Sequence, residues 1–135
     1  MHPSGIVDKF LQLDFLPAQR HLEPGQVAQC VIDHEVTLCH FVPSMLTEFL
    51  RCPTAERCIS LRAVFCSGEE LTAGQVRRFR QVMDTELYNL YGPTEAAIDV
   101  TFWPCSSEDV SRTLIGAPIS NCTLVVLTDD GSPTP

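Results

Sequence analysis

Short apolar runs alternate with helical patterns through the middle of this chain, and this alternation constrains the fold more than any other feature. The runs at residues 36–42 and 61–66 predict buried strands. Apolar residues at helical spacing from residue 25 predict a helix before the first run, and residues 45–50, with Ser44 as the expected cap, predict a second helix after it. Alternating helices and strands favour a parallel sheet that helices cover.

The next stretch repeats this alternation. Thr72 opens a Thr-x-x-Gln capping box, which predicts that a third helix begins directly after it. An apolar run at 86–90 predicts a third strand, and a Gly-Pro pair at 92–93 turns the chain at its end. Residues 100–103 and 123–127 are rich in β-forming side chains. The expected fold class is therefore α/β, with a mostly parallel sheet, covering helices and a β-rich C-terminal end.

The charge balance limits the kinds of partner. Nine basic residues stand against seventeen acidic ones, a net charge of −8 at pH 7. This excess of negative charge argues against nucleic acid and against an anionic membrane surface. No apolar run approaches the length of a membrane span, and charges interrupt the N-terminal stretch where a signal peptide would be apolar. A cytoplasmic protein is expected.

The seven cysteines are expected to be reduced thiols. Their number is odd, and they include no Cys-x-x-Cys pair and no Cys/His cluster with zinc spacing. Cys39 and Cys66 lie in apolar runs, where cysteine behaves as a small hydrophobic residue. A structural role is therefore expected for them rather than a catalytic one.

The densest chemistry lies at residues 88–95, Tyr-Asn-Leu-Tyr-Gly-Pro-Thr-Glu, where rings, a tight turn, a hydroxyl and a carboxylate follow one another. The turn comes after an expected strand, and open α/β sheets bind ligands at the carboxyl ends of their strands. Thr94 is placed to cap a short helix at 95–98. A nucleotide site and a plain capped helix both fit these eight residues.

A family resemblance separates these alternatives. The run 89–95 resembles the Asn-x-Tyr-Gly-Pro-Thr-Glu motif of adenylation domains in nonribosomal peptide synthetases, which belong to the adenylate-forming, AMP-binding superfamily. The resemblance continues upstream through 40–46 and 64–71, and downstream through 98–104 and 115–121. It implies a central part of the large N-terminal domain of an adenylate-forming enzyme.

The resemblance covers residues 24–135 as a partial adenylation domain and leaves residues 1–23 unassigned. It implies a site for ATP and Mg²⁺. Tyr91 would stack on adenine, Asn89 would hydrogen-bond the exocyclic amine, and Thr94 would contact the α-phosphate. Glu95 would hold the magnesium ion, so Thr94 and Glu95 are the expected catalytic residues. The implied ATP-binding residues are Gly68, Glu69, Glu70, Asn89, Tyr91, Gly92 and Thr94.

The resemblance also implies a pocket for the side chain of an amino-acid substrate. Its residues would be His40, Phe65, Ser67, Leu90, Ile98 and Asp99, a set that resembles serine-activating domains. His40 and Asp99 would hydrogen-bond the hydroxyl, and a pocket built around a hydroxyl rejects analogues that lack it. Without the resemblance, His40 reads as a core histidine and Asp99 as a surface carboxylate.

The implied function is activation of an amino acid, expected to be serine, to the aminoacyl-AMP. The acyl group would pass to phosphopantetheine on a carrier domain, beside a condensation domain. The family's glycine-rich phosphate loop and catalytic lysine have no counterpart here, since the only lysine is Lys9. The 135-residue chain alone is therefore expected to be inactive. An inactive remnant and a piece of an acyl-CoA synthetase-like ligase are the alternatives.

Overall fold

Five strands form one sheet in the order β1-β2-β3-β4-β5. The computed structural model describes residues 23–93, 95, 99–106 and 111–134. The first three strands run parallel to one another, and β4 and β5 continue the sheet antiparallel. This confirms the expected α/β class, with the parallel part first and the β-rich part after it. The strands are β1 Leu38–Phe41, β2 Ala63–Cys66, β3 Glu86–Tyr91, β4 Thr101–Cys105 and β5 Ala117–Pro118.

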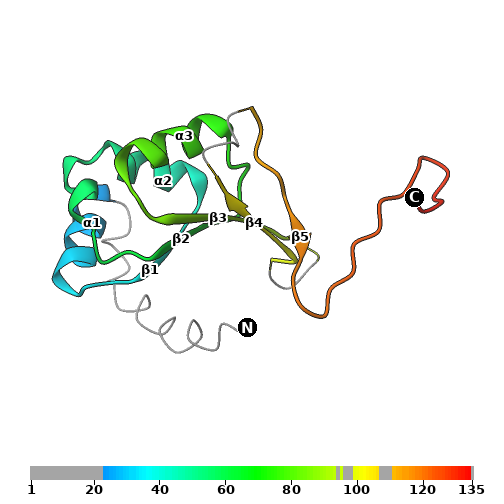
Figure 1. Cartoon of the computed structure of the whole chain (residues 1–135), viewed down its shortest axis with the longest axis horizontal. Helices are drawn as coiled ribbons and strands as arrows, with labels where there is room; N and C mark the ends of the chain where they lie inside the picture. The colour runs from blue at the N-terminus through cyan, green and yellow to red at the C-terminus, as the bar shows by residue number, and fades with distance from the viewer. Residues whose placement is uncertain (1–22, 94, 96–98, 107–110, 135) are drawn as a thin grey trace.

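The helices connect the parallel strands. They are α1 Pro24–Asp33, α2 Pro43–Arg51, the short 3₁₀ helix η2 Pro53–Arg57 and α3 Ala73–Val82. Because β1, β2 and β3 are neighbours in chain order, α2 and α3 are the crossover connections of two successive parallel pairs. Figure 1 shows both helices on the same side of the sheet, as right-handed crossovers require.

The N-terminus of α3 agrees with the prediction from the sequence, whereas the N-terminus of α2 does not. At α3 the predicted capping box is present: the Thr72 hydroxyl accepts from the Gln75 backbone, and the Gln75 side chain accepts from the Thr72 backbone. At α2 the prediction of Ser44 as the cap is wrong. The residue at the capping position is Val42, whose side chain makes no capping hydrogen bond, and Pro43 is the first helical residue. Proline suits that position because its missing N–H would have no partner in the helix.

The core lies between the helices and one face of the sheet. Alternate residues of β1 show the reason, because Cys39 and Phe41 are buried while His40 between them is exposed. From the helices, Leu46, Phe49 and Phe79 pack into the same cluster and are almost fully buried. Helical and strand periodicity therefore point their apolar residues at one shared layer.

The C-terminal part departs from the sequence-based expectation. The predicted strand at 100–103 is present as β4 and continues through Pro104, which pairs with Tyr88. Proline is tolerated here because β5 pairs only with Thr101 and Phe102, at the other end of β4. The predicted strand at 123–127 is wrong, since that stretch is exposed and forms only an isolated bridge at Leu127.

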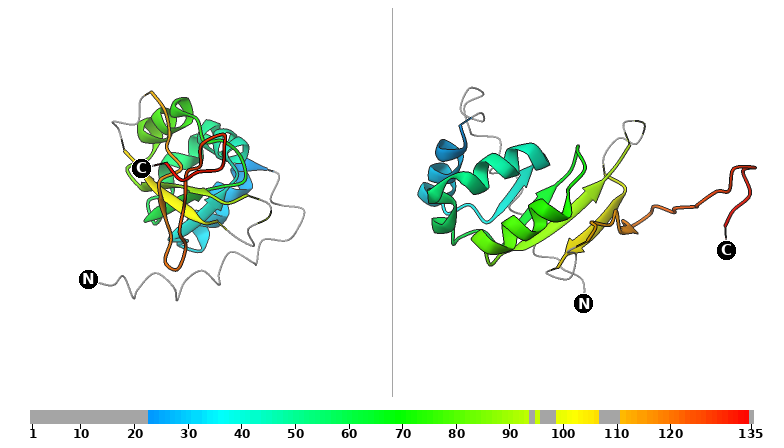
Figure 2. Two further views of the ribbon diagram at one scale, coloured as in Figure 1. Left: turned by 90° about the vertical axis from the view of Figure 1, so that its right-hand side faces the viewer. Right: turned by 90° about the horizontal axis from the view of Figure 1, so that it is seen from above.

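The segment after β5 extends away from the sheet (Figures 1 and 2). Its apolar side chains Leu124, Val125, Val126 and Leu127 are all exposed. β-propensity reports how well a side chain fits a packed, pleated surface, and the described residues offer these four no such surface. This explains why a strongly β-forming run is not a strand here.

The cysteines follow the expectation of reduced thiols. All seven lie among the described residues, and none is in a disulfide. Burial raises the pKa of the Cys39 thiol and of the Cys66 thiol to about 12 in each case. Both thiols therefore stay protonated near neutral pH and pack as small apolar groups. Within the described ranges, no helix is long and apolar enough to cross a membrane.

Candidate functional site

The carboxyl ends of β2 and β3 border a cavity of about 480 Å³, which we call the β2–β3 cleft. Parallel strands end at the same edge of a sheet, so the loops that follow them meet there. This volume lies within the range of small-molecule and cofactor sites. The cleft is lined by Gly68, Glu69, Glu70, Leu71, Asn89, Leu90, Tyr91, Gly92, Thr113 and Ile115.

One wall of the cleft is the loop from β2 to α3. Gly68 has a φ of +86°, a left-handed conformation that favours glycine. A Cβ atom at this position would also lie 3.3 Å from Cγ1 of Val42. The next residue, Glu69, turns its carboxylate to Ser44, accepting from the backbone N–H and from the hydroxyl at 2.9 Å each. The wall is therefore fastened to the first turn of α2.

Another wall of the cleft comes from the segment before β5. The side-chain amide of Asn89 donates to the Leu114 carbonyl at 2.9 Å, which ties this segment to β3. Thr113 and Ile115, on either side of Leu114, both line the cleft. Sequence reasoning missed Thr113 and Leu114, because only the resemblance beginning at Ile115 marked this region, and no local pattern predicts a contact across twenty-five residues.

Of the ring and the carboxylate of the motif, the Tyr91 ring belongs to a residue that lines the cleft. The Tyr91 side chain is 43 % exposed, so its ring is available to a ligand. Glu95 is exposed in a turn four residues later. Thr94 lies outside the described residues, as do residues 96–98 of the short helix expected at 95–98. Among the described residues, no three His, Cys, Asp or Glu side chains gather as a metal site.

A single exposed carboxylate still fits a magnesium ion. Magnesium usually keeps several waters and binds through one or two carboxylates together with phosphate oxygens of the substrate. Glu95 is of the right chemistry for that arrangement and stands beside a turn that borders the cleft. The ion would supply charge neutralisation at the phosphates.

Four of the six expected substrate-pocket residues share the sheet face that points away from the helices. His40 and Phe65 are register partners on β1 and β2, and alternation along β2 places Ser67 on the same face as Phe65. The His40 imidazole Nε2 and the Ser67 hydroxyl lie 2.7 Å apart and are hydrogen-bonded. Leu90 lies on the same face and also lines the cleft, so the two sets of residues are contiguous.

A stacked pair of aromatic rings lies on the same face of the sheet. Phe65 stacks on Tyr88 with ring centroids 5.3 Å apart. The Tyr88 hydroxyl donates to a Glu86 carboxylate oxygen at 2.7 Å, and this bond, with burial, raises the pKa of Tyr88 to about 12. Of the two remaining pocket residues, Ile98 lies outside the described residues, and Asp99 is half-buried just before β4.

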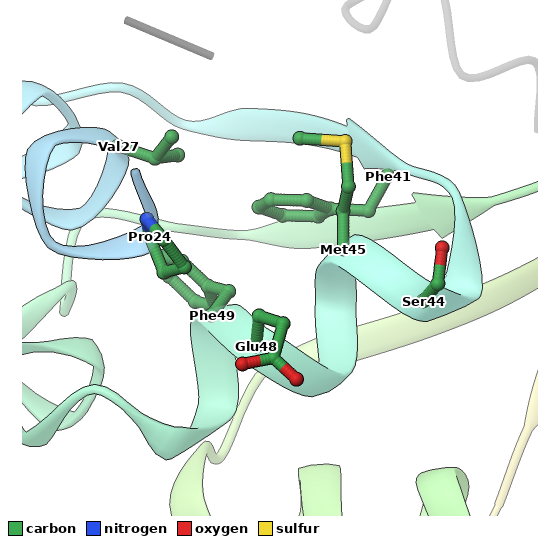
Figure 3. A pocket seen from close by; sticks show the side chains of 7 residues that line it. All are labelled: Pro24, Val27, Phe41, Ser44, Met45, Glu48 and Phe49. Carbon is green, nitrogen blue, oxygen red and sulfur yellow. The ribbon is translucent and has the colours of Figure 1, made fainter. Parts of the chain in front are cut away.

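A second, smaller pocket of about 190 Å³ is lined by residues of α1, β1 and α2 (Figure 3). It is mainly apolar, with Val27 of α1, Phe41 of β1 and Phe49 of α2 in its walls. Met45 covers it from α2, and Ser44 and Glu48 give it a polar rim. None of the residues expected from the motif lines this pocket, so the candidate site is the β2–β3 cleft.

The structure is that of a mixed α/β protein with a cavity at the carboxyl ends of two parallel strands. A family model described as AMP-binding enzyme matches residues 12–135. The chain therefore belongs to the AMP-binding enzyme family, the class of adenylate-forming ligases that the motif at 89–95 indicated.

Curated relatives support this assignment. The chain is 45 % identical over 116 residues to phosphinothricin tripeptide synthetase PhsB of Streptomyces viridochromogenes, covering 85 % of this chain and 10 % of that protein. It is 38 % identical over 126 residues to enterobactin synthase component F of Escherichia coli, covering 87 % and 10 %. It is also 38 % identical over 117 residues to tyrocidine synthase 3 of Brevibacillus parabrevis, covering 86 % and 2 %. The chain thus spans a tenth or less of these relatives.

Solved structures share the fold. CmiS6 superposes with a TM-score of 0.79 at 23 % identity, over 89 % of this chain and 30 % of that one. PA1221, described as a nonribosomal peptide synthetase protein containing adenylation and PCP domains, superposes with a TM-score of 0.74 at 22 % identity, over 90 % and 24 %. The fold is consistent with part of the large N-terminal domain of an adenylate-forming enzyme.

Proposed function

We propose that this chain is part of an amino-acid adenylation domain and that the β2–β3 cleft seats the adenine end of ATP. One observation carries this proposal. Six of the seven residues expected to bind ATP, all except Thr94, line a single cavity. In the reaction a carboxylate oxygen of the amino acid attacks the α-phosphorus of ATP and pyrophosphate leaves, so the site's work is positioning and charge neutralisation.

The chemistry of Asn89 supports an adenine site. The Leu114 carbonyl only accepts hydrogen bonds, so the Asn89 side chain must turn its NH₂ group toward it. This leaves the Asn89 side-chain oxygen as an acceptor. An exocyclic amine is a donor, so the adenine amine fits this oxygen. The Leu114 contact therefore selects the amide orientation that adenine recognition needs.

ATP titration of the 135-residue chain tests the nucleotide site. Replacing Tyr91 by alanine removes the stacking ring, and base–aromatic stacking is strong enough to weaken ATP binding roughly tenfold. Phe102→Ala is the matched control, because Phe102 is a similarly exposed ring on the adjacent strand, at 39 % against 43 %, and does not line the cleft. Equal binding by both variants would contradict the stacking role, and no ATP binding by the unchanged chain would contradict the site.

We further propose serine as the amino acid. The hydrogen-bonded pair His40 and Ser67 supports a pocket that accepts a small hydroxyl, and Phe65 and Leu90 restrict its size. Asp99 is proposed as a second hydroxyl partner, and Ile98 as a further wall. The test is the preference for serine over alanine in the native polypeptide. His40→Ala should lower that preference by roughly tenfold or more, because an analogue without the hydroxyl no longer leaves a polar group unpaired.

The partners proposed for the parent protein follow from the same reaction. The aminoacyl-AMP would be captured by phosphopantetheine on a carrier domain, with a condensation domain next in the assembly. A relative in structure, PA1221, is described as containing adenylation and PCP domains, which supports a carrier partner. Glu95 is proposed to bind Mg²⁺ together with the nucleotide phosphates. We expect no pyrophosphate exchange by the 135-residue chain alone.

Surface exposure distinguishes a part of a synthetase from an inactive remnant. The exposed side chains from Leu124 to Leu127 form an apolar row, which packed neighbours would normally cover. This exposure favours a part of a synthetase over an inactive remnant. The isolated chain should therefore bind a hydrophobic dye, and replacing Val125 and Val126 by threonine should reduce the signal. In the source cells, an antibody against residues 106–114 should detect a band far above 15.0 kDa. A band near that mass would support the remnant.

A further inference from the structure

The loop from β2 to α3 and the first turn of α3 are both hydrogen-bonded to the first turn of α2. Within the loop, the Glu69 carboxylate accepts from the Ser44 backbone N–H and from the Ser44 hydroxyl, both at 2.9 Å. Beyond the loop, the Gln75 side-chain NH₂ donates to the Pro43 carbonyl at 2.9 Å. The loop is therefore fixed to α2 near its middle and again in the first turn of α3.

Glu69 supplies the cap that α2 lacks in its own sequence. The first amides of a helix have no partner within the helix. At α2 the capping residue is Val42, which provides no side-chain acceptor, and Pro43 has no N–H. Ser44 therefore carries the first unpaired amide of α2, and a carboxylate at this position also interacts favourably with the positive end of the helix. Hydrogen bonds to a carboxylate are among the strong ones.

The same bonds set the position of a cleft wall. Glu69 lines the cleft as well as reaching Ser44, so its bonds to α2 fix the backbone from Gly68 to Glu70. They also hold the Glu69 charge at a helix N-terminus. Released, this carboxylate would be free to turn toward the cleft, where its negative charge would repel a nucleotide.

We propose that Ser44 and Glu69 form a clamp that positions the 68–70 wall for nucleotide binding. The proposal rests on the nucleotide site proposed for the β2–β3 cleft, and it makes Ser44 a positioning residue with no contact to the ligand. Ser44→Ala is the sharpest test, because it removes one bond of the clamp and leaves the Glu69 charge in place. Ser44→Thr keeps a hydroxyl and should restore the function.

The experiment is a double-mutant cycle on the full chain with ATP as the probe. Ser44→Ala should weaken ATP binding by roughly tenfold, the lower end of what one hydrogen bond to a charged group contributes. When Glu69 is already alanine, adding Ser44→Ala should not weaken ATP binding further, because the carboxylate that accepts from the Ser44 hydroxyl is absent. Glu48→Ala is the control, since it removes the same charge from an exposed position of α2 that borders only the smaller pocket. This control should bind ATP as the unchanged chain does.

Amide hydrogen exchange gives a readout that does not depend on ATP. The Ser44 amide should exchange faster in Glu69→Ala than in Glu48→Ala. If it does not, or if Ser44→Ala binds ATP as the unchanged chain does, the clamp is overturned while the nucleotide site stands. A fall in melting temperature with unchanged ATP affinity would also overturn it, because the pair would then be structural only. If the unchanged chain does not bind ATP, both proposals fail.

Discussion

The side-chain amide of Asn89 donates to the backbone carbonyl of Leu114 at 2.9 Å, and this bond joins two walls of the β2–β3 cleft. Asn89 is 7 % exposed and sits on β3, whereas Leu114 belongs to the segment that leads into β5. A buried amide with a fixed partner is rigid, so its free oxygen has a defined direction. The same residue therefore closes the cleft and presents an acceptor to it.

Asn89→Asp should destabilise the chain. The substitution keeps the shape of the side chain but replaces the NH₂ donor with an oxygen that faces the Leu114 carbonyl, and losing a buried hydrogen bond in this way costs roughly 2 kcal/mol in free energy of unfolding. Urea denaturation measures this loss. Asn121→Asp is the control, because it makes the same chemical change at an exposed position and should leave stability nearly unchanged. Equal effects at both positions would contradict the role of the Leu114 contact.

Thr72→Ala should lower stability by about 1 kcal/mol, because the variant loses the side-chain acceptor that caps α3. Thr72→Ser keeps the hydroxyl and should recover most of the loss. Thermal denaturation of the three proteins checks this. A serine variant as unstable as the alanine variant would show that the methyl group matters, and not the capping bond.

Gly116→Ala should disrupt the junction of β4 and β5. Gly116 has a φ of +82°, and a Cβ atom there would lie 1.9 Å from the Phe102 carbonyl oxygen. Gly131 has the same φ but no heavy atom within 4 Å of a Cβ position, so Gly131→Ala pays only the backbone strain, roughly 1–2 kcal/mol. Comparison of the two unfolding free energies separates steric clash from strain. Equal losses would mean that no clash occurs at Gly116.

Stability should fall in alkaline solution. The folded state raises the pKa of the Cys66 thiol from 9.0 to about 12, mainly through burial, and raises that of Cys39 to about 12 for the same reason. Above the unfolded pKa, the unfolded thiols ionise while the folded ones stay protonated, so the unfolded state binds fewer protons. The stability these groups contribute is therefore complete below pH 9.0 and is lost progressively up to about pH 12.

Melting temperature measured across this alkaline range tests the thiol contribution. Cys66→Ala removes one ionisable group, so its melting temperature should fall less steeply with pH than that of the unchanged chain. Tyr88 titrates in the same direction, with its pKa raised to about 12 by its bond to Glu86, and remains in both proteins. Identical slopes for the two proteins would contradict a buried, protonated Cys66.

Local patterns predicted the parallel half of the fold well. Periodicity located β1, β2, β3 and the helices between them, because each of these elements buries one regular face against a shared core. The Thr72 box was predicted because both of its partners lie within one helical turn. The cap of α2 was not, since its acceptor, Glu69, lies twenty-five residues from Ser44 and only the tertiary fold brings them together.

The candidate site shows the same division. The motif at 89–95 and the loop at 68–70 were predicted through family resemblance, and the fold brings seven of their residues to one cavity. The wall formed by Thr113 and Ile115 was not predicted, because it depends on the contact of Asn89 with Leu114. The run at 123–127 was expected to be a strand from its local composition, and that prediction was wrong. Its β-propensity is real, but the described residues provide no surface for it to pack on.

Amino-acid-dependent exchange between ATP and labelled pyrophosphate, measured on the native polypeptide from the source cells, tests the central claim most directly. Exchange requires that an amino-acid carboxylate attacks the α-phosphate reversibly, which is the reaction proposed for this domain. We predict strong exchange with serine, weaker exchange with threonine, which is excluded mainly by its volume, and little with alanine. Exchange that no amino acid raises above background would contradict the account.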